Sequence, residues 1–346
     1  MHDAEPVTDP ILDDAQRDMV REDRALITGA SGFLGGRLRK ALVEAGADVV
    51  AIRRSSSPEP SEGRSVVADY ADVGSLASVV KAEGPDVVYH VAGATKGVTY
   101  EDFQRANVMP TRNLLAALEA EHPEVKRFVL VSSLAAYGPS TADRPHREEH
   151  EPAPIEHYGR SKLEAERLLE AESERVAWTI IRPGGVYGPG DVDYFNLFRE
   201  IESRRNVYFG NRERWFSGVY VDDCVRAIVG AAYAEKAARG AYFICDGVPV
   251  TWGTFQEAIV RASGRSVLTL NLPELLVDVA AVFGELATKI DGKPRLFNKQ
   301  KAKMGAQEAW TCQHDAAHRD FGYEPRVPVE RGVELALGWY REHGWL

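Results

Sequence analysis

The chain has 346 residues, 44% of them hydrophobic and 27% charged, so it can bury one large or two modest cores and is not expected to be disordered. Its 42 basic and 52 acidic side chains leave a formal charge of -10, which repels phosphate backbones and anionic lipid. We therefore expect no nucleic-acid partner. The three cysteines, Cys224, Cys245 and Cys312, are too few and too widely spaced for a disulfide framework or a zinc site. A cytoplasmic protein without a metal is expected.

Neither of two segments has the pattern of a targeting or membrane sequence. Residues 1–23 are acidic and lack the basic and apolar regions of a signal peptide, so we interpret them as an N-terminal extension that is loosely ordered or docked on the surface. The most apolar later stretch, from Leu270 to Ile290, is interrupted by charged side chains and is a poor candidate for a membrane span. We expect a helix there that covers a pocket.

Short apolar runs alternate with helical patterns through the first 180 residues or so. The runs are Ala25 to Thr28, Asp48 to Ile52, Ser65 to Ala68, Asp86 to Val91, Arg127 to Ser132 and Val176 to Ile181. Such alternation predicts consecutive βαβ units, and runs that are apolar on both faces favour a parallel sheet covered by helices on each side. The expected fold class is α/β, a doubly wound parallel sheet of the Rossmann type.

The alternation breaks after Pro183, where a glycine-rich loop begins. We expect a dinucleotide-binding domain over residues 24–182, to which residues 219–245 return. Residues 183–218 and 246–346 should form a smaller α/β substrate-binding domain that closes with an amphipathic helix near Val329 to Tyr340.

A glycine-rich turn follows the first predicted strand. Gly29, Gly32 and Gly35 stand after that strand and at the start of a predicted helix. Such glycines permit a tight turn and let a pyrophosphate approach the amides at a helix N-terminus, although a purely structural turn could use them too. The strand before and the helix after favour a dinucleotide site. The neighbouring residues expected to contact the cofactor are Ser31, Phe33 and Leu34.

Arg53 and Arg54 follow the second predicted strand, where a site that prefers NAD usually presents an acid to the adenosine ribose. Guanidinium groups at that position suit a 2′-phosphate, so NADP is favoured, with NAD as the other possibility. The alternative is that one or both arginines are solvated surface charges.

A catalytic group is predicted at the start of a later helix. Tyr158 and Lys162 are four residues apart and so share one face of that helix. A neighbouring ammonium is expected to lower the pKa of the phenol, which makes it a better proton carrier at neutral pH. Ser133 ends a predicted strand about 25 residues earlier and would hydrogen-bond the reacting oxygen, with Ser132 as the alternative hydroxyl.

Together the segments TGASGFLG, VSSLAAYG, YGRSK, IIRPGGVYGPGD and VYVDD resemble the extended short-chain dehydrogenase/reductase family, from about Arg24 to the C-terminus. The resemblance implies catalysis by Ser133, Tyr158 and Lys162, with Lys162 also at the nicotinamide ribose. The residues that it implies or that we expect along the cofactor are Asp69, Tyr70, Ala92, Gly93, Ala94, Asn107, Ser132, Arg182, Pro183, Gly185 and Val186. Lys96 and Tyr187 are expected to join Ser133 and Tyr158 around a small-molecule substrate.

The C-terminal half resembles the 3β-hydroxysteroid dehydrogenase and dihydroflavonol reductase branch through the apolar segment Leu270 to Leu286, Phe297-Asn-Lys and Gly322-Tyr-Glu-Pro325. That branch implies hydride transfer between NADPH and a ketone or secondary alcohol on an apolar, steroid- or lipid-like molecule. The alternative is that these apolar residues are only the core of the small domain.

Other functions of the same family stay open. A nucleotide-sugar 4-epimerase with tightly bound NAD would need cations that clamp a diphosphate, and the candidates are Arg204, Arg205, Arg212 and Arg214. A dehydratase is disfavoured because Leu134-Ala135 stands where the family places an Asp-Glu pair. A non-catalytic sensor or scaffold would usually lack the tyrosine or the lysine. The family often forms homodimers through two helices, here Val108 to Ala120 and Lys162 to Ala171.

Overall fold

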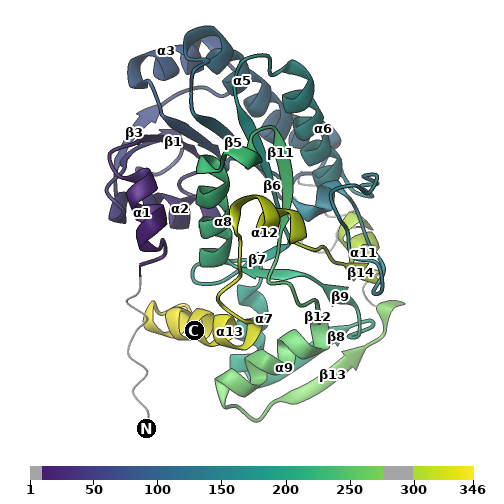
Figure 1. Ribbon diagram of the computed structural model, residues 1–346. Helices are drawn as coiled ribbons and strands as arrows, with labels where there is room; N and C mark the ends of the chain where they lie inside the picture. Colours follow the sequence, from purple (N-terminus) through teal and green to yellow (C-terminus); the bar gives the residue numbers. More distant parts are fainter. Residues whose placement is uncertain (1–9, 276–298) are drawn as a thin grey trace.

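A computed structural model of the protein describes residues 10–275 and 299–346. Its centre is a seven-stranded sheet in the order β3-β2-β1-β4-β5-β6-β11, with every neighbouring pair parallel (Figure 1). The strands are β1 (Arg24–Thr28), β2 (Asp48–Arg53), β3 (Arg64–Val67), β4 (Val87–His90), β5 (Arg127–Val131), β6 (Trp178–Pro183) and β11 (Gly240–Ile244). The predicted doubly wound α/β fold is confirmed.

Helices cover both faces of this sheet, so its central strands are buried on both sides. One face packs against α2 (Phe33–Glu44), α8 (Val221–Tyr233) and α12 (Asp315–Phe321). The other packs against α3 (Val73–Glu83), α5 (Met109–Glu121) and α6 (His157–Glu172). The short helices of this part are α4 (Tyr100–Phe103), the π-helical turn η1 (Gln104–Val108), η2 (Leu134–Ala136) and η3 (Glu235–Ala237).

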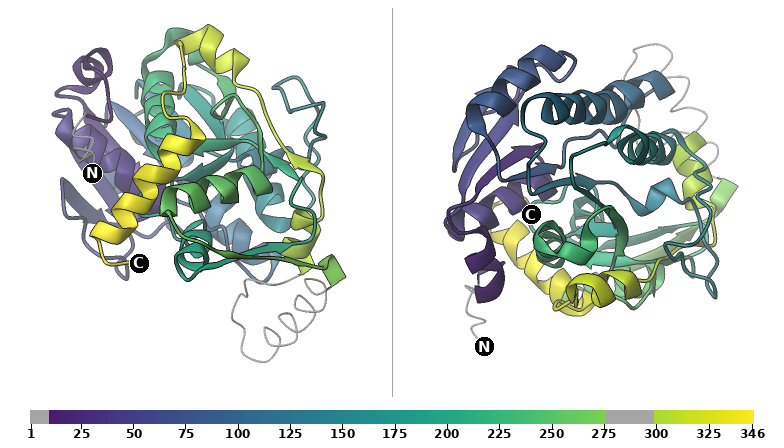
Figure 2. Two further views of the ribbon diagram at one scale, coloured as in Figure 1. Left: turned by 90° about the horizontal axis from the view of Figure 1, so that it is seen from below. Right: turned by 45° about the horizontal axis from the view of Figure 1, so that its top comes forward.

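A smaller body lies below the carboxyl ends of the strands in Figure 1. Its helices are α7 (Phe195–Glu202), α9 (Trp252–Ser263), α11 (Lys299–Gly305) and α13 (Val329–Glu342). Its strands are β7 (Gly185–Tyr187), β8 (Arg205–Phe209), β9 (Trp215–Phe216), β10 (Gly218–Tyr220), β12 (Val250–Thr251), β13 (Leu268–Leu272) and β14 (Ala309–Trp310). Figure 2 shows α13 beside α9, and their shared core buries Phe198, Phe255 and Tyr340.

The chain returns from the smaller body to the large sheet through α8 and β11. Strand β11 pairs with β6 in register Gly240↔Thr179 to Ile244↔Pro183, and α8 packs on β5 and β6. The chain therefore passes from the larger body into the smaller one and back again. Asp223 at the start of α8 accepts hydrogen bonds from the backbone of Arg326 and Val327, which ties the C-terminal segment to this helix.

The described part of the N-terminal extension is docked on the protein. Helix α1 (Asp14–Val20) contacts α8, the Gln16 side chain donates to the Arg226 carbonyl at 2.8 Å, and Ile11 and Leu12 are buried. Residues 10–20 therefore cover part of the outer surface of α8.

The helix expected between Leu270 and Ile290 is wrong at its start. Leu268–Leu272 form β13 because β8 offers a parallel partner, with Leu270 opposite Val207. Residues 276–298 lie outside the described residues, and they include most of that expected helix together with Phe297 and Asn298. Within residues 10–275 and 299–346, no helix is long and apolar enough to cross a bilayer.

Candidate active site

A cavity of about 560 Å³ opens at the carboxyl ends of β1, β2, β4, β5 and β6. This edge of a parallel sheet is where doubly wound folds bind ligands. The predicted residues that line it are Gly29, Ser31, Gly32, Phe33, Leu34, Gly35, Arg53, Arg54, Tyr70, Ala92, Gly93, Ala94, Ser132, Ser133, Tyr158, Lys162, Pro183 and Val186.

The glycine turn at one end of this cavity has the shape that a pyrophosphate requires. Gly29 has φ 74°, and a Cβ there would lie 2.7 Å from the Ala92 nitrogen. A Cβ on Gly35 would lie 2.3 Å from the Gly29 carbonyl oxygen. Gly32 caps α2 without any side chain accepting from its first amides. Because these amides face the cavity uncapped, the residues present fit the phosphates of a dinucleotide.

The two arginines at the far end of the cavity differ in their surroundings. The Arg53 guanidinium donates to Ser65 Oγ at 3.1 Å and to the Ser57 carbonyl at 3.3 Å. The Arg54 guanidinium has no hydrogen bond or ion pair with any described residue. Arg54 is therefore the cation that is free to bind a ligand there.

Helix α6 brings Tyr158 and Lys162 to the middle of the cavity, with Lys162 Nζ 5.9 Å from the centre of the Tyr158 ring. Burial raises the pKa of Tyr158 to about 12, and a hydrogen bond with Ser133 offsets part of that rise. Burial lowers the pKa of Lys162 to about 8, which the charge of Glu166 opposes. The Lys162 ammonium donates to the Val131 carbonyl at 2.9 Å.

The structure therefore does not bear out the expectation that the Lys162 ammonium lowers the pKa of Tyr158. The phenol is desolvated, and the ammonium is directed to a strand carbonyl. Tyr158 carries its proton at neutral pH and is a donor.

The two serines after β5 have separate surroundings. Ser132 donates to the Glu166 carboxylate, which lies behind the cavity wall, whereas Ser133 hydrogen-bonds Tyr158. Ser133 also faces the second cavity described next, and Ser132 does not. The geometry favours Ser133 over Ser132 as the hydroxyl beside a reacting oxygen.

A second cavity of about 310 Å³ adjoins the first and shares Thr95, Ser133, Tyr158 and Gly184 with it. The smaller body supplies an aromatic wall that consists of Tyr194, Trp215, Phe216, Trp252 and Trp310. Within this wall Phe216 and Trp252 stack with their ring centres 4.4 Å apart. A molecule held there would meet flat apolar surfaces and have one end beside Tyr158.

Some residues expected at the site lie elsewhere. Asp69 is exposed, and its carboxylate accepts a hydrogen bond from the backbone of its own turn at Ala71. Asn107 is buried and hydrogen-bonds Ala94 and Ser161. Arg182 is buried in an ion pair with Glu166. None of these three lines either cavity.

The remaining displaced residues belong to the substrate side. Gly185 lines the second cavity rather than the first. Lys96 lines neither cavity and forms a 2.8 Å ion pair with Asp193, which lines the second cavity. Tyr187 is fully buried in the core of the smaller body.

Sequence reasoning missed Thr95 and Gly184, which join the two cavities, although each adjoins a predicted residue. The aromatic wall was not predicted either, because its residues are spread over more than 100 positions without a regular spacing. Among the described residues, no group of histidines, cysteines and acids could hold a metal ion.

Residues 25–245 match the family model described as the NAD dependent epimerase/dehydratase family. The chain is 27% identical to ceramide reductase from Caulobacter vibrioides, over 92% of this chain and 95% of the relative. It is also 27% identical to 3-beta-hydroxysteroid dehydrogenase from Mycolicibacterium neoaurum, over 92% of each chain. In fold it is similar to UDP-glucose 4-epimerase from Thermotoga maritima, with a TM-score of 0.77, 22% identity and coverage of 92% and 99%. The chain belongs to the NAD dependent epimerase/dehydratase family and is a nicotinamide-dependent dehydrogenase/reductase of the extended short-chain type.

Proposed function

We propose that this enzyme transfers hydride between NADPH and a ketone or secondary alcohol on an apolar, steroid- or lipid-like molecule. The observation that carries the proposal is the junction of the two cavities at Ser133 and Tyr158, with the glycine turn on one side and the aromatic wall on the other. The relatives named as ceramide reductase and 3-beta-hydroxysteroid dehydrogenase point to the same substrate class.

In the proposed mechanism Ser133 and Tyr158 hold the substrate oxygen. When bound, the nicotinamide supplies or takes up the hydride. Tyr158 donates its proton to the oxygen during reduction, which suits a phenol that stays protonated at neutral pH. The Lys162 ammonium stabilises the negative charge that develops on Tyr158 as the proton leaves. Reduction is the favoured direction because a cell usually keeps its NADP pool reduced.

The preference for NADPH rests on Arg53 and Arg54 at the adenosine end of the first cavity. We expect Arg54→Gln to raise the Kd of NADPH about 10- to 100-fold, because a hydrogen bond to a charged group is worth ~1.5–3 kcal/mol. Arg53→Gln should have a smaller effect, since Arg53 is engaged by Ser65 and Ser57. Fluorescence titration with NADPH and NADH measures both constants. An equal loss for the two nucleotides would contradict a role in reading the 2′-phosphate.

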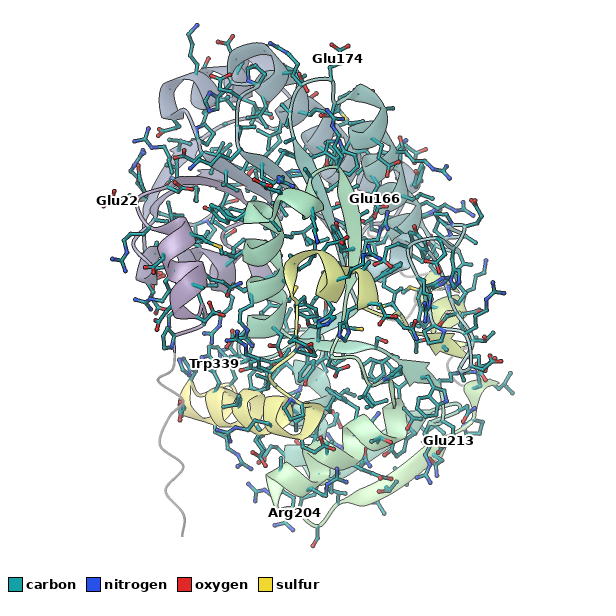
Figure 3. The ribbon with its side chains drawn as sticks, viewed as in Figure 1. Glu22, Glu166, Glu174, Arg204, Glu213 and Trp339 are labelled. Atoms are coloured by element: carbon teal, nitrogen blue, oxygen red, sulfur yellow. The ribbon has the colours of Figure 1, made fainter. Side chains whose placement is uncertain are left out.

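A nucleotide-sugar 4-epimerase is the second candidate, because Arg214 lines the second cavity. However, Arg214 is bound to Glu274 at 2.8 Å. Arg212 pairs with Glu213 and Arg205 with Glu200. Arg204 lies at the lower tip of the protein (Figure 3), outside the lining of that cavity. A diphosphate would have to displace an existing ion pair, so the reductase is favoured.

The cofactor itself decides between the two candidates. The protein is denatured, any released nucleotide is identified, and the nucleotide-free form is titrated with NADPH and NADH. Exchangeable NADPH with a strong preference supports a reductase and directs substrate trials to hydrophobic ketones. Tightly held NAD with little response to NADPH makes the epimerase the leading candidate.

We further propose a cytoplasmic homodimer that associates through α5 and α6, by analogy with the family. Sedimentation velocity of the purified protein measures the mass in solution.

A further inference from the structure

Glu166 is a buried acid that the proposed mechanism does not use. It lies on α6, one turn after Lys162 and two turns after Tyr158, and its side chain is 1% exposed. Its carboxylate accepts a hydrogen bond from Ser132 Oγ and three from Arg182, with the Nη2 contact at 2.8 Å. Figure 3 labels Glu166 in the body that contains the seven-stranded sheet. Burying a charge this deeply costs free energy of desolvation unless the charge is well paired, so we ask what Glu166 contributes beside the site.

The two partners of Glu166 come from the ends of adjacent strands. Ser132 follows β5 and precedes Ser133, and Arg182 belongs to β6 and precedes Pro183, which lines the first cavity. The Arg182 guanidinium also lies 4.6 Å from the Tyr137 ring centre and 5.6 Å from that of Phe243. One carboxylate on the catalytic helix therefore ties together the two strand ends that border the catalytic centre.

Glu166 also acts on Lys162 through its charge. Lys162 is 5% exposed, and its burial lowers the pKa of the ammonium to about 8, against which the negative charge of Glu166 works. The titratable groups that face Lys162 are Tyr158 and Glu166 on α6 and the buried His90 on β4. Those that face Glu166 are Arg182 on β6, Tyr137 after η2 and Glu170 on α6. Among the groups facing Lys162, Glu166 is the one carboxylate in the described chain.

We infer that Glu166 is a positioning residue, whose carboxylate holds the ends of β5 and β6 in register with α6 and keeps the Lys162 ammonium charged during turnover. The inference rests on the proposed function of Tyr158 and Lys162.

Glu166→Gln keeps the shape of the side chain and removes its charge. The pKa of Lys162 is already lowered, so removing a negative neighbour lowers it further and the ammonium is lost at a lower pH. We expect the alkaline limb of kcat/KM for ketone reduction to move toward acid by about one pH unit. The matched control is Glu170→Gln, one turn farther along α6 and exposed, which should leave the limb in place.

A second measurement does not depend on turnover. The deprotonated Lys162 amine reacts with acetic anhydride, and mass spectrometry of labelling against pH gives its pKa directly. We expect the same downward shift in Glu166→Gln and none in Glu170→Gln. If the labelling curve shifts in Glu166→Gln but the wild type reduces no ketone, the proposed function fails while the coupling of Glu166 to Lys162 stands. If neither the pH limb nor the labelling curve moves in Glu166→Gln, the inference is overturned.

Glu166→Asp separates position from charge and covers the case in which the Gln variant does not fold. The shorter side chain keeps its charge but cannot reach Ser132 and Arg182 together. We expect kcat to fall about tenfold with the pH limb unmoved and the NADPH Kd within threefold of wild type. Wild-type kcat in Glu166→Asp would overturn the positioning role.

Discussion

Replacing Tyr158 by Phe should lower kcat for ketone reduction by about a thousandfold or more, while the Kd of NADPH changes less than about threefold. General acid catalysis contributes typically 10²–10⁴-fold, and the phenol hydroxyl is the proton donor at the junction of the two cavities. The ring itself stays, so the wall of the cofactor cavity is kept. Steady-state kinetics and fluorescence titration on the same preparation measure both effects.

Tyr100→Phe is the matched control. Tyr100 donates its hydroxyl to Glu164 on the outside of α6 and lines neither cavity, so its loss should leave kcat within about twofold of wild type. Turnover in Tyr158→Phe that equals wild type would remove the catalytic assignment. A loss of NADPH binding in the same variant would instead indicate a collapsed cavity.

Replacing Gly35 by Ala should weaken NADPH binding by about a hundredfold or more. The new Cβ would lie 2.3 Å from the Gly29 carbonyl oxygen and 2.8 Å from its carbonyl carbon. Real Cβ atoms do not approach backbone so closely, so the turn must move away from α2. The amides that face the cavity then no longer converge on the pyrophosphate.

Gly36→Ala tests whether this loss is specific, because it adds the same methyl group one residue later in α2. The new Cβ would lie 3.4 Å from its nearest neighbour, the Ala30 carbonyl oxygen, which is an ordinary van der Waals distance. Alanine is also favoured over glycine in a helix by about 1 kcal/mol, so this variant should bind NADPH as wild type does and unfold at an equal or higher temperature. Calorimetry and cofactor titration compare the pair. Equal NADPH binding in Gly35→Ala and wild type would contradict the assigned role of the turn.

The amino-acid sequence by itself determined that the chain forms a parallel sheet covered by helices, and where most of its strands lie along the chain. Continuous apolar runs such as Arg127–Val131 become strands buried on both faces, and the helix predicted after the glycine turn forms as α2. Local sequence patterns also predicted the glycine turn and the i, i+4 pair of Tyr158 and Lys162, because both features depend on residues close together in the chain.

Only the tertiary structure decided which residues face the cavities and in what state of charge. Arg182 and Tyr187 adjoin a cavity-lining segment in sequence, yet one is drawn into an ion pair with Glu166 and the other into the core. The pKa of Tyr158 rises rather than falls because its burial outweighs the other influences on it. The aromatic wall joins residues from Tyr194 to Trp310 that no spacing connects. Side-chain direction, desolvation and long-range contacts arise from packing between distant segments, which local sequence patterns do not encode.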